Sequence, residues 1–151
     1  MMKLARIGLV LTAVAGFSLP TSLSADEASF VGAMNDEFTK NAIGTVAQTR
    51  GEVARCTSYW QLWAEQYESA VPAQYRAAVT EGLRPEATAA AVEWHEALAD
   101  ETWDRSDFEM LERRVRDMRR AETTGRELLA KWRADPTDAS FFSWLGSCGT
   151  R

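Results

Sequence analysis

The single histidine, His95, is the side chain with the widest range of chemistry in this sequence. Histidine holds haem or metal ions, transfers protons and senses pH. The supporting motifs, Cys-x-x-Cys-His for haem, Glu-x-x-His for di-iron bundles and His-Glu-x-x-His for zinc, are missing. At 100° per residue, His95 lies on an apolar helix face with its acidic neighbours on the opposite side. We predict a hydrogen-bonded core histidine, with no catalytic residue, cofactor or metal site. A haem or metal carrier using His95 with Met34, Met110 or Met118 is an alternative.

Five carboxylates near this histidine raise the question of acid–base catalysis or cation binding: Glu93, Glu96, Asp100, Asp104 and Asp107. A general acid needs an apolar pocket that raises its pKa, and a calcium site needs oxygen ligands on an irregular turn. Because these acids follow a helix face and the loop after it, we predict a solvated acidic surface. A peptidoglycan hydrolase using Glu93, Glu96 or Asp100 is a second alternative, which a cleft around one of them would favour.

Five arginines crowd one segment of the sequence, and out of context they resemble an anion-binding stripe: Arg113, Arg114, Arg116, Arg119 and Arg120. Glu109 precedes Arg113 by four residues and Glu112 precedes Arg116 by four, the favourable order for ion pairs along a helix. We therefore predict self-pairing. The like-charged Arg116 and Arg120 are expected to contact the acidic segment 93–107 across the bundle.

Six tryptophans are many for 151 residues, and tryptophan serves both cores and binding surfaces. Periodicity assigns Trp60, Trp63 and Trp132 to the core. Trp94 and Trp103 are the two expected to reach solvent. Aromatic side chains rimmed by charge are typical of interface hot spots. We therefore predict a partner contact at these two tryptophans, with the surrounding acids Asp100, Asp104 and Asp107.

The first 25 residues have the pattern of a cleavable export signal. Lys3 and Arg6 are followed by an apolar run over 7–19 and by small residues before Asp26. The run of about 13 residues is shorter than the roughly 18 or more that a membrane-spanning helix needs. We expect cleavage after Ser24 or Ala25, a periplasmic location, and no transmembrane segment after signal removal.

An exported protein reaches an oxidising compartment, so the two cysteines are predicted to form a disulfide, Cys56–Cys148. The bridge would close a loop of about 90 residues. In the chain-entropy model such a loop contributes about 4–5 kcal/mol. The predicted disulfide ties the C-terminal tail to the body of the protein.

Helical periodicity runs through residues 26–151, which we predict to be a single all-α domain. The expected fold is a compact bundle of four main helices plus two short ones. The main helices are predicted at 27–42, 45–70, 85–100 and 107–133, and the short ones at 74–81 and 137–145. A packing seam is expected on the second: Val46, Val53, Cys56, Trp60, Trp63, Tyr67 and Ala70.

The long helix after residue 106 has three further sequence signals. Ser106 followed by Glu109 resembles a capping box. A core stripe is then expected over Phe108, Leu111, Val115 and Met118. It is interrupted at 122–125, which predicts a bend, a shift of face or a contact with the short helix at 74–81.

The net charge and the missing motifs exclude several classes of partner and of enzyme. Removal of Lys3 and Arg6 from 17 basic residues leaves 15 against 22 acidic ones, a net charge of −7. Nucleic acid and anionic lipid are poor partners for such a chain. Gly-rich phosphate loops and Gly-x-Ser-x-Gly are missing. We expect binding rather than catalysis: protein–protein contact with another periplasmic or envelope protein, as a chaperone, inhibitor, immunity protein or assembly subunit.

Overall fold

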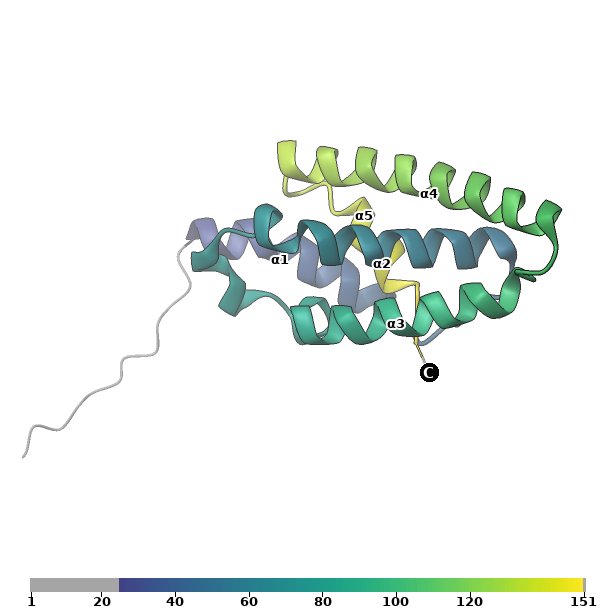
Figure 1. Ribbon diagram of the computed structural model, residues 1–151. Coiled ribbons are helices and arrows are strands. Elements are labelled where there is room, and N and C mark those ends of the chain that lie inside the picture. Colours follow the sequence, from purple (N-terminus) through teal and green to yellow (C-terminus); the bar gives the residue numbers. More distant parts are fainter. Residues whose placement is uncertain (1–24, 151) are drawn as a thin grey trace, which may run out of the picture.

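The computed structural model describes residues 25–150, and every regular element in that range is helical (Figure 1). The four long helices are α1 (Ala25–Asn41), α2 (Arg50–Ala70), α3 (Pro85–Thr102) and α4 (Phe108–Ala134), followed by the short α5 (Ser140–Gly146). The predicted all-α bundle is confirmed. The predicted signal peptide lies outside the described residues, apart from Ala25. Within 25–150, no helix has the length and apolarity that a membrane crossing requires.

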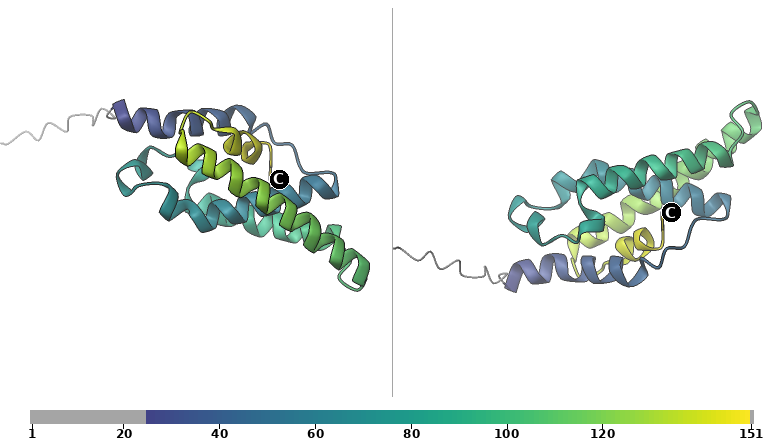
Figure 2. Two further views of the ribbon diagram at one scale, coloured as in Figure 1. Left: turned by 90° about the horizontal axis from the view of Figure 1, so that it is seen from above. Right: turned by 90° about the horizontal axis from the view of Figure 1, so that it is seen from below.

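Helix α2 is the centre of the bundle. It has extensive contacts with α3 on one side and α4 on the other, while α1 packs mainly on α5 (Figures 1 and 2). The seam predicted for α2 is buried from its second member onward: Val53, Cys56, Trp60, Trp63, Tyr67 and Ala70. These side chains contact others from all five helices. Burying apolar side chains of every helix in this shared core therefore provides the hydrophobic stabilisation of the fold.

The start of α2 is five residues later than predicted. Thr49 and Glu52 form a capping box, in which each side chain accepts a hydrogen bond from the backbone of the other. Gly44 has a φ of 72°, a conformation that favours glycine. Thr45 after it bonds the C-terminal tail, accepting from the Gly149 N–H and donating to the Ser147 carbonyl. The Thr45 carbonyl thus bonds the tail instead of continuing a helix, and its hydroxyl adds a second bond to the tail.

The segment between α2 and α3 forms two 3₁₀ turns, η1 (Ala73–Ala78) and η2 (Glu81–Leu83), where one short helix over 74–81 was predicted. Side chains from other helices fix it in place. The Asn35 amide donates to the Ala78 carbonyl and accepts from the Thr80 N–H, both at 2.9 Å. The Trp63 indole donates to the Leu83 carbonyl, also at 2.9 Å.

Helix α4 begins at Phe108 with Asp107 as its N-cap, so the predicted capping role of Ser106 is wrong. The Asp107 carboxylate accepts from the backbone N–H groups of Glu109 and Met110, which a helix start leaves without partners. Gly125 is buried against α2. A Cβ there would lie 2.7 Å from a Leu62 methyl group. Of the three alternatives predicted for the interruption at 122–125, none named α2, and the structure shows a close contact with α2 there.

The Cys56–Cys148 disulfide is present, with the two Cα atoms 5.3 Å apart. It holds the tail that follows α5 against the middle of α2. The Trp60 indole also donates to the Cys148 carbonyl at 3.3 Å. Phe141, Phe142 and Leu145 of α5 are fully buried in the core.

Candidate binding face

His95 is a buried core histidine, as predicted. It has no exposed surface, and its Nε2 lies 3.2 Å from the Cys148 carbonyl. A carbonyl only accepts, so Nε2 carries the proton in this contact. Burial lowers the pKa of His95 below its ordinary value, which favours the neutral ring. The ring also packs edge-to-face on Trp94 at 4.8 Å between centroids.

The methionines considered as additional metal ligands lie in two different hydrophobic clusters. Met34 is in the main core, and Met110 and Met118 pack against the second cluster, which contains Trp103. Among the described residues, no three His, Cys, Asp or Glu side chains come close enough together to hold a metal ion.

The five carboxylates are all exposed, which confirms the solvated acidic surface. Asp100 makes ion pairs with Arg105 and with Arg114, the latter at 2.7 Å. Hydrogen bonds from these two arginines lower the pKa of Asp100, the opposite of what a general acid requires. Glu96 accepts from the Gln61 amide of α2 at 2.8 Å. The Asp100 and Glu96 contacts connect α3 to its neighbours.

Trp103 does not reach solvent, and that prediction is wrong: its side chain is fully buried. Helix α3 extends to Thr102 rather than ending at Asp100. His95, Ala99 and Trp103 are therefore spaced by four residues and all point into the core. Trp94 is half-buried. The predicted aromatic patch among Asp100, Asp104 and Asp107 thus lacks one of its two tryptophans.

The arginines of α4 fall into two groups. Arg114 pairs with Asp100 of α3, and Arg126 pairs with Glu65 of α2 as well as with Glu122. These arginines connect α4 to its neighbours.

Arg116, Arg119 and Arg120 form the second group. In the part of the chain that the structure describes, no carboxylate lies within 4.0 Å of them. The predicted Glu112–Arg116 pair is not formed, whereas Glu109–Arg113 is present at 3.9 Å. The acidic segment is contacted by Arg114 rather than by Arg116 or Arg120.

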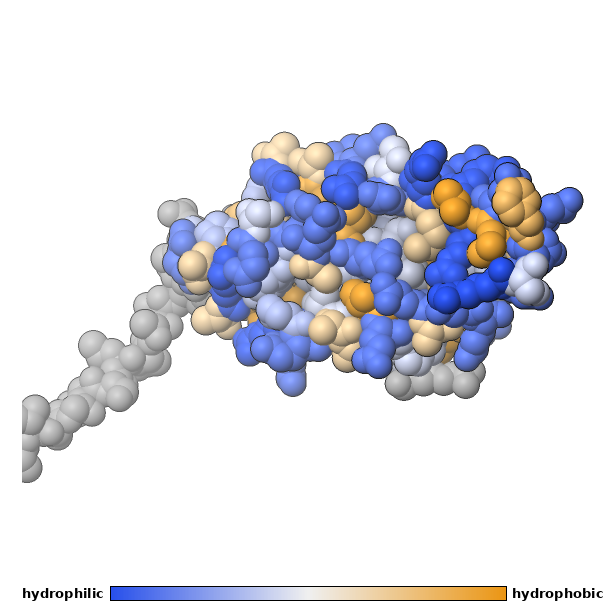
Figure 3. Space-filling model, in the orientation of Figure 1, coloured by the Kyte–Doolittle hydropathy of each residue, from blue (hydrophilic) through white to orange (hydrophobic). Residues whose placement is uncertain are grey.

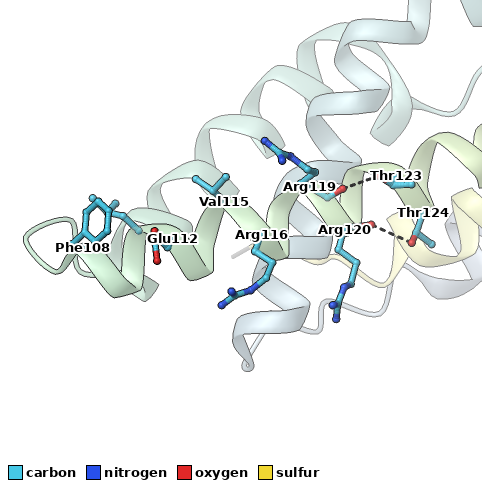
Figure 4. A pocket seen from close by; sticks show the side chains of 9 residues that line it. Phe108, Glu112, Val115, Arg116, Arg119, Arg120, Thr123 and Thr124 are labelled. Carbon is cyan, nitrogen blue, oxygen red and sulfur yellow. Dashed lines mark hydrogen bonds between the residues drawn. The ribbon is translucent and has the colours of Figure 1, made fainter.

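These three arginines line a shallow hollow of about 820 Å³ along the outer side of α4 (Figure 4). Phe108 and Val115 line it too and are 73% and 56% exposed, so their predicted place in a core stripe is wrong. Figure 4 shows Phe108, Val115 and Arg119 along one edge of the helix, with Arg116 and Arg120 extending side by side along the other. The outer side of α4 is therefore both apolar and basic.

A second hollow, of about 320 Å³, lies between α2, α4 and α5. It shares Arg120 and Thr124 with the first, so the two are adjacent. Trp144 of α5 lines it and is 45% exposed. The Arg55 guanidinium lies over its indole ring at 4.3 Å, a cation–π contact. We call the two hollows together the α4 face.

Comparison with family models, curated proteins and solved structures found no match to this chain. The α4 face is therefore assessed on its own chemistry. Apolar side chains are gathered there: of the four large hydrophobic side chains exposed in the described residues, Phe108, Val115 and Trp144 line it. Figure 3 shows hydrophobic side chains at the end of the molecule where α4 begins.

The inward side of α4 differs from the predicted stripe and has a recognisable pattern. The residues on this side recur at spacings of three and four and include both small and long side chains: Met110, Arg114, Met118, Ala121, Gly125, Leu129 and Trp132. Ala121 and Gly125, one turn apart, are the sequence signal that indicates the inward side of α4, because small residues allow close approach of two helices. With that register, Phe108 and Val115 fall outside the inward side.

Proposed function

We propose that this is an exported periplasmic protein that acts by protein–protein contact, with the α4 face as its contact surface. A chaperone, an inhibitor, an immunity protein and an assembly subunit all act in this way. The α4 face supports the proposal, because stability alone does not favour exposing Phe108, Val115 and Trp144 in one region.

The lining of the face supports the same proposal. Exposed aromatic side chains beside arginines have the composition of interface hot spots, where tryptophan and arginine are enriched. Phe108 lies at one end of the face and Trp144 at the other, with Arg116, Arg119 and Arg120 between them. A partner that covered this face would bury apolar surface and pair the arginines at once.

Export is supported by the sequence pattern over 1–25 and by the disulfide, which is compatible with an oxidising compartment. N-terminal sequencing of the protein recovered from a periplasmic fraction tests this part. A chain that begins at Ala25 or Asp26 is expected. A chain that retains Met1 and stays in the cytoplasm would contradict it.

Contact through the α4 face is tested by placing a photo-crosslinking amino acid at Val115 in living cells. Ala97, exposed on α3, is the matched control position. We expect a discrete crosslinked product from position 115 and none from 97. The absence of a product at 115, or equal products at both positions, would contradict the use of this surface.

A further inference from the structure

The α4 face has the length to accommodate a helix. Along α4, Phe108 and Thr124 are separated by about 24 Å at 1.5 Å per residue. A partner helix of about 16 residues covers that distance. Side chains in i, i+3 and i+4 rows pack into the grooves of a neighbouring helix, and helix-in-groove recognition uses anchors with this spacing.

The charge of the face defines the partner further. Helix α4 has eight basic and five acidic residues, a net charge of +3 in a chain whose total is −5. Arg114 and Arg126 have carboxylate partners. Arg116, Arg119 and Arg120 have none in residues 25–150. Arg116 and Arg120 are four residues apart, where like charges destabilise a helix. Carboxylates from a partner would remove that repulsion and form charge-assisted hydrogen bonds.

The junction with α5 adds one more cationic group. The Arg55 guanidinium lies there over the Trp144 indole ring. A carboxylate at this end of the face would approach Arg55 and Arg120 together, since both line the second hollow.

We propose that the α4 face binds an acidic amphipathic helix of a partner protein. This inference rests on the proposed contact function. Apolar side chains of the partner pack on Phe108, Leu111 and Val115, and its carboxylates pair with Arg116, Arg119 and Arg120. Glu112 and Asp117 line the two hollows as well, so the partner's carboxylates must lie toward the arginines and away from these two acids.

The experiment is a selection of displayed helical 18-residue peptides on the disulfide-bonded protein, followed by affinity measurement of the enriched peptides. Arg120→Glu is the test variant, because Arg120 lines both hollows. Lys131→Glu is the matched control, since it reverses one exposed charge on the same helix outside them. We expect enriched peptides with an apolar face bordered by Asp and Glu, bound at least 10-fold more weakly by Arg120→Glu and within twofold of wild type by Lys131→Glu.

Charge reversal in the peptide completes the test. Replacing its acidic residues by lysine should weaken binding to the wild type and restore binding to Arg120→Glu. Enrichment of neutral or basic peptides, or of none, would overturn the acidic-helix inference. If crosslinking from position 115 still succeeded in that case, the contact function itself would stand. Binding to phosphatidylglycerol vesicles that Arg120→Glu abolishes, without peptide binding, would overturn the inference in favour of a lipid surface.

Discussion

Helices α3 and α4 flank α2 on opposite sides and differ in chemistry. Helix α3 has five acidic residues and no lysine or arginine, and its outward positions carry glutamates and alanines. Helix α4 has a net charge of +3 and exposes Phe108 and Val115. The histidine and acids that suggested chemistry in the sequence lie on the α3 side, yet the larger hollow lies along α4.

The polar groups on the α3 side have structural roles, because each pairs or hydrogen-bonds with a neighbour in the fold. Asp100 has two arginine partners, Glu96 has Gln61, and His95 has the Cys148 carbonyl. On the α4 face, apolar surface and arginines remain without such partners. Exposed apolar side chains and arginines without carboxylate partners therefore occur together on α4, although the net charge of the whole chain is negative.

The largest effect is expected from cutting the tether on the α3 side with Cys148→Ser. The variant loses the constraint on a loop of 92 residues, which in the chain-entropy model contributes about 4–5 kcal/mol to the free energy of unfolding. Urea unfolding measures the loss. Wild type under reducing agent should fall to the level of the variant, and a variant as stable as oxidised wild type would contradict the prediction.

On the α4 side, Gly125→Ala is expected to push α4 away from α2. The new Cβ would lie 2.7 Å from a Leu62 methyl group and 2.9 Å from the Tyr59 ring. Overpacking of this kind costs about 1–3 kcal/mol. Gly32→Ala is the control, because a Cβ in that helix meets nothing within 4 Å, and a gain of about 0.5–1 kcal/mol is expected. Equal melting temperatures of the two variants would refute the close contact.

The pH dependence of stability probes His95. Burial lowers its pKa in the folded protein, so below the ordinary value of 6.5 the unfolded chain binds a proton that the native state does not. The stabilisation is present above pH 6.5 and is lost as the pH falls towards the folded pKa. One proton changes stability by no more than about 1.4 kcal/mol per pH unit.

His95→Gln should remove this component. Urea midpoints at pH 7.5 and pH 5 are then expected to differ less in the variant than in wild type. Identical differences would mean that the imidazole does not titrate as its burial predicts.

The smallest effect on stability is expected from Phe108→Ser with Val115→Ser. Both side chains are exposed, and surface changes of this kind stay within about 0.5 kcal/mol. The same pair should abolish crosslinking from a probe at position 119 if α4 is the contact surface. Leu129→Ser, on the buried side of the same helix, should instead cost several kcal/mol. A comparable loss from the exposed pair would place those side chains in the core.

Sequence reasoning was most accurate where periodicity was long and regular. The seam on α2 was identified from Val53 to Ala70 because its apolar residues recur at steps of three and four. The predicted core stripe on α4 was wrong, because the residues of this helix form two rows with helical spacing and the more apolar row is not the buried one. Phe108, Leu111 and Val115 form one row, and the buried row includes Arg114 and Gly125, which hydrophobicity alone does not select.

Helix ends caused the other errors. An end predicted at Asp100 placed Trp103 in a solvated connection, and two more residues of helix turn it into the core. Trp144 lies on the short helix α5 with Phe141 and Phe142, and one helix cannot point all three side chains the same way. The exposed tryptophan of the candidate binding surface is therefore Trp144 and not Trp103.

Local periodicity and a single pair of cysteines were enough to predict the helical class, the seam on α2 and the Cys56–Cys148 bridge, because they leave few alternatives. Which side of α4 meets α2, and which arginines find carboxylates, depended on the packing of the folded chain. Those outcomes depend on helices distant in sequence: Gly125 must fit against Leu62, and Arg114 must reach Asp100. The α4 face is the surface that these long-range contacts leave uncovered.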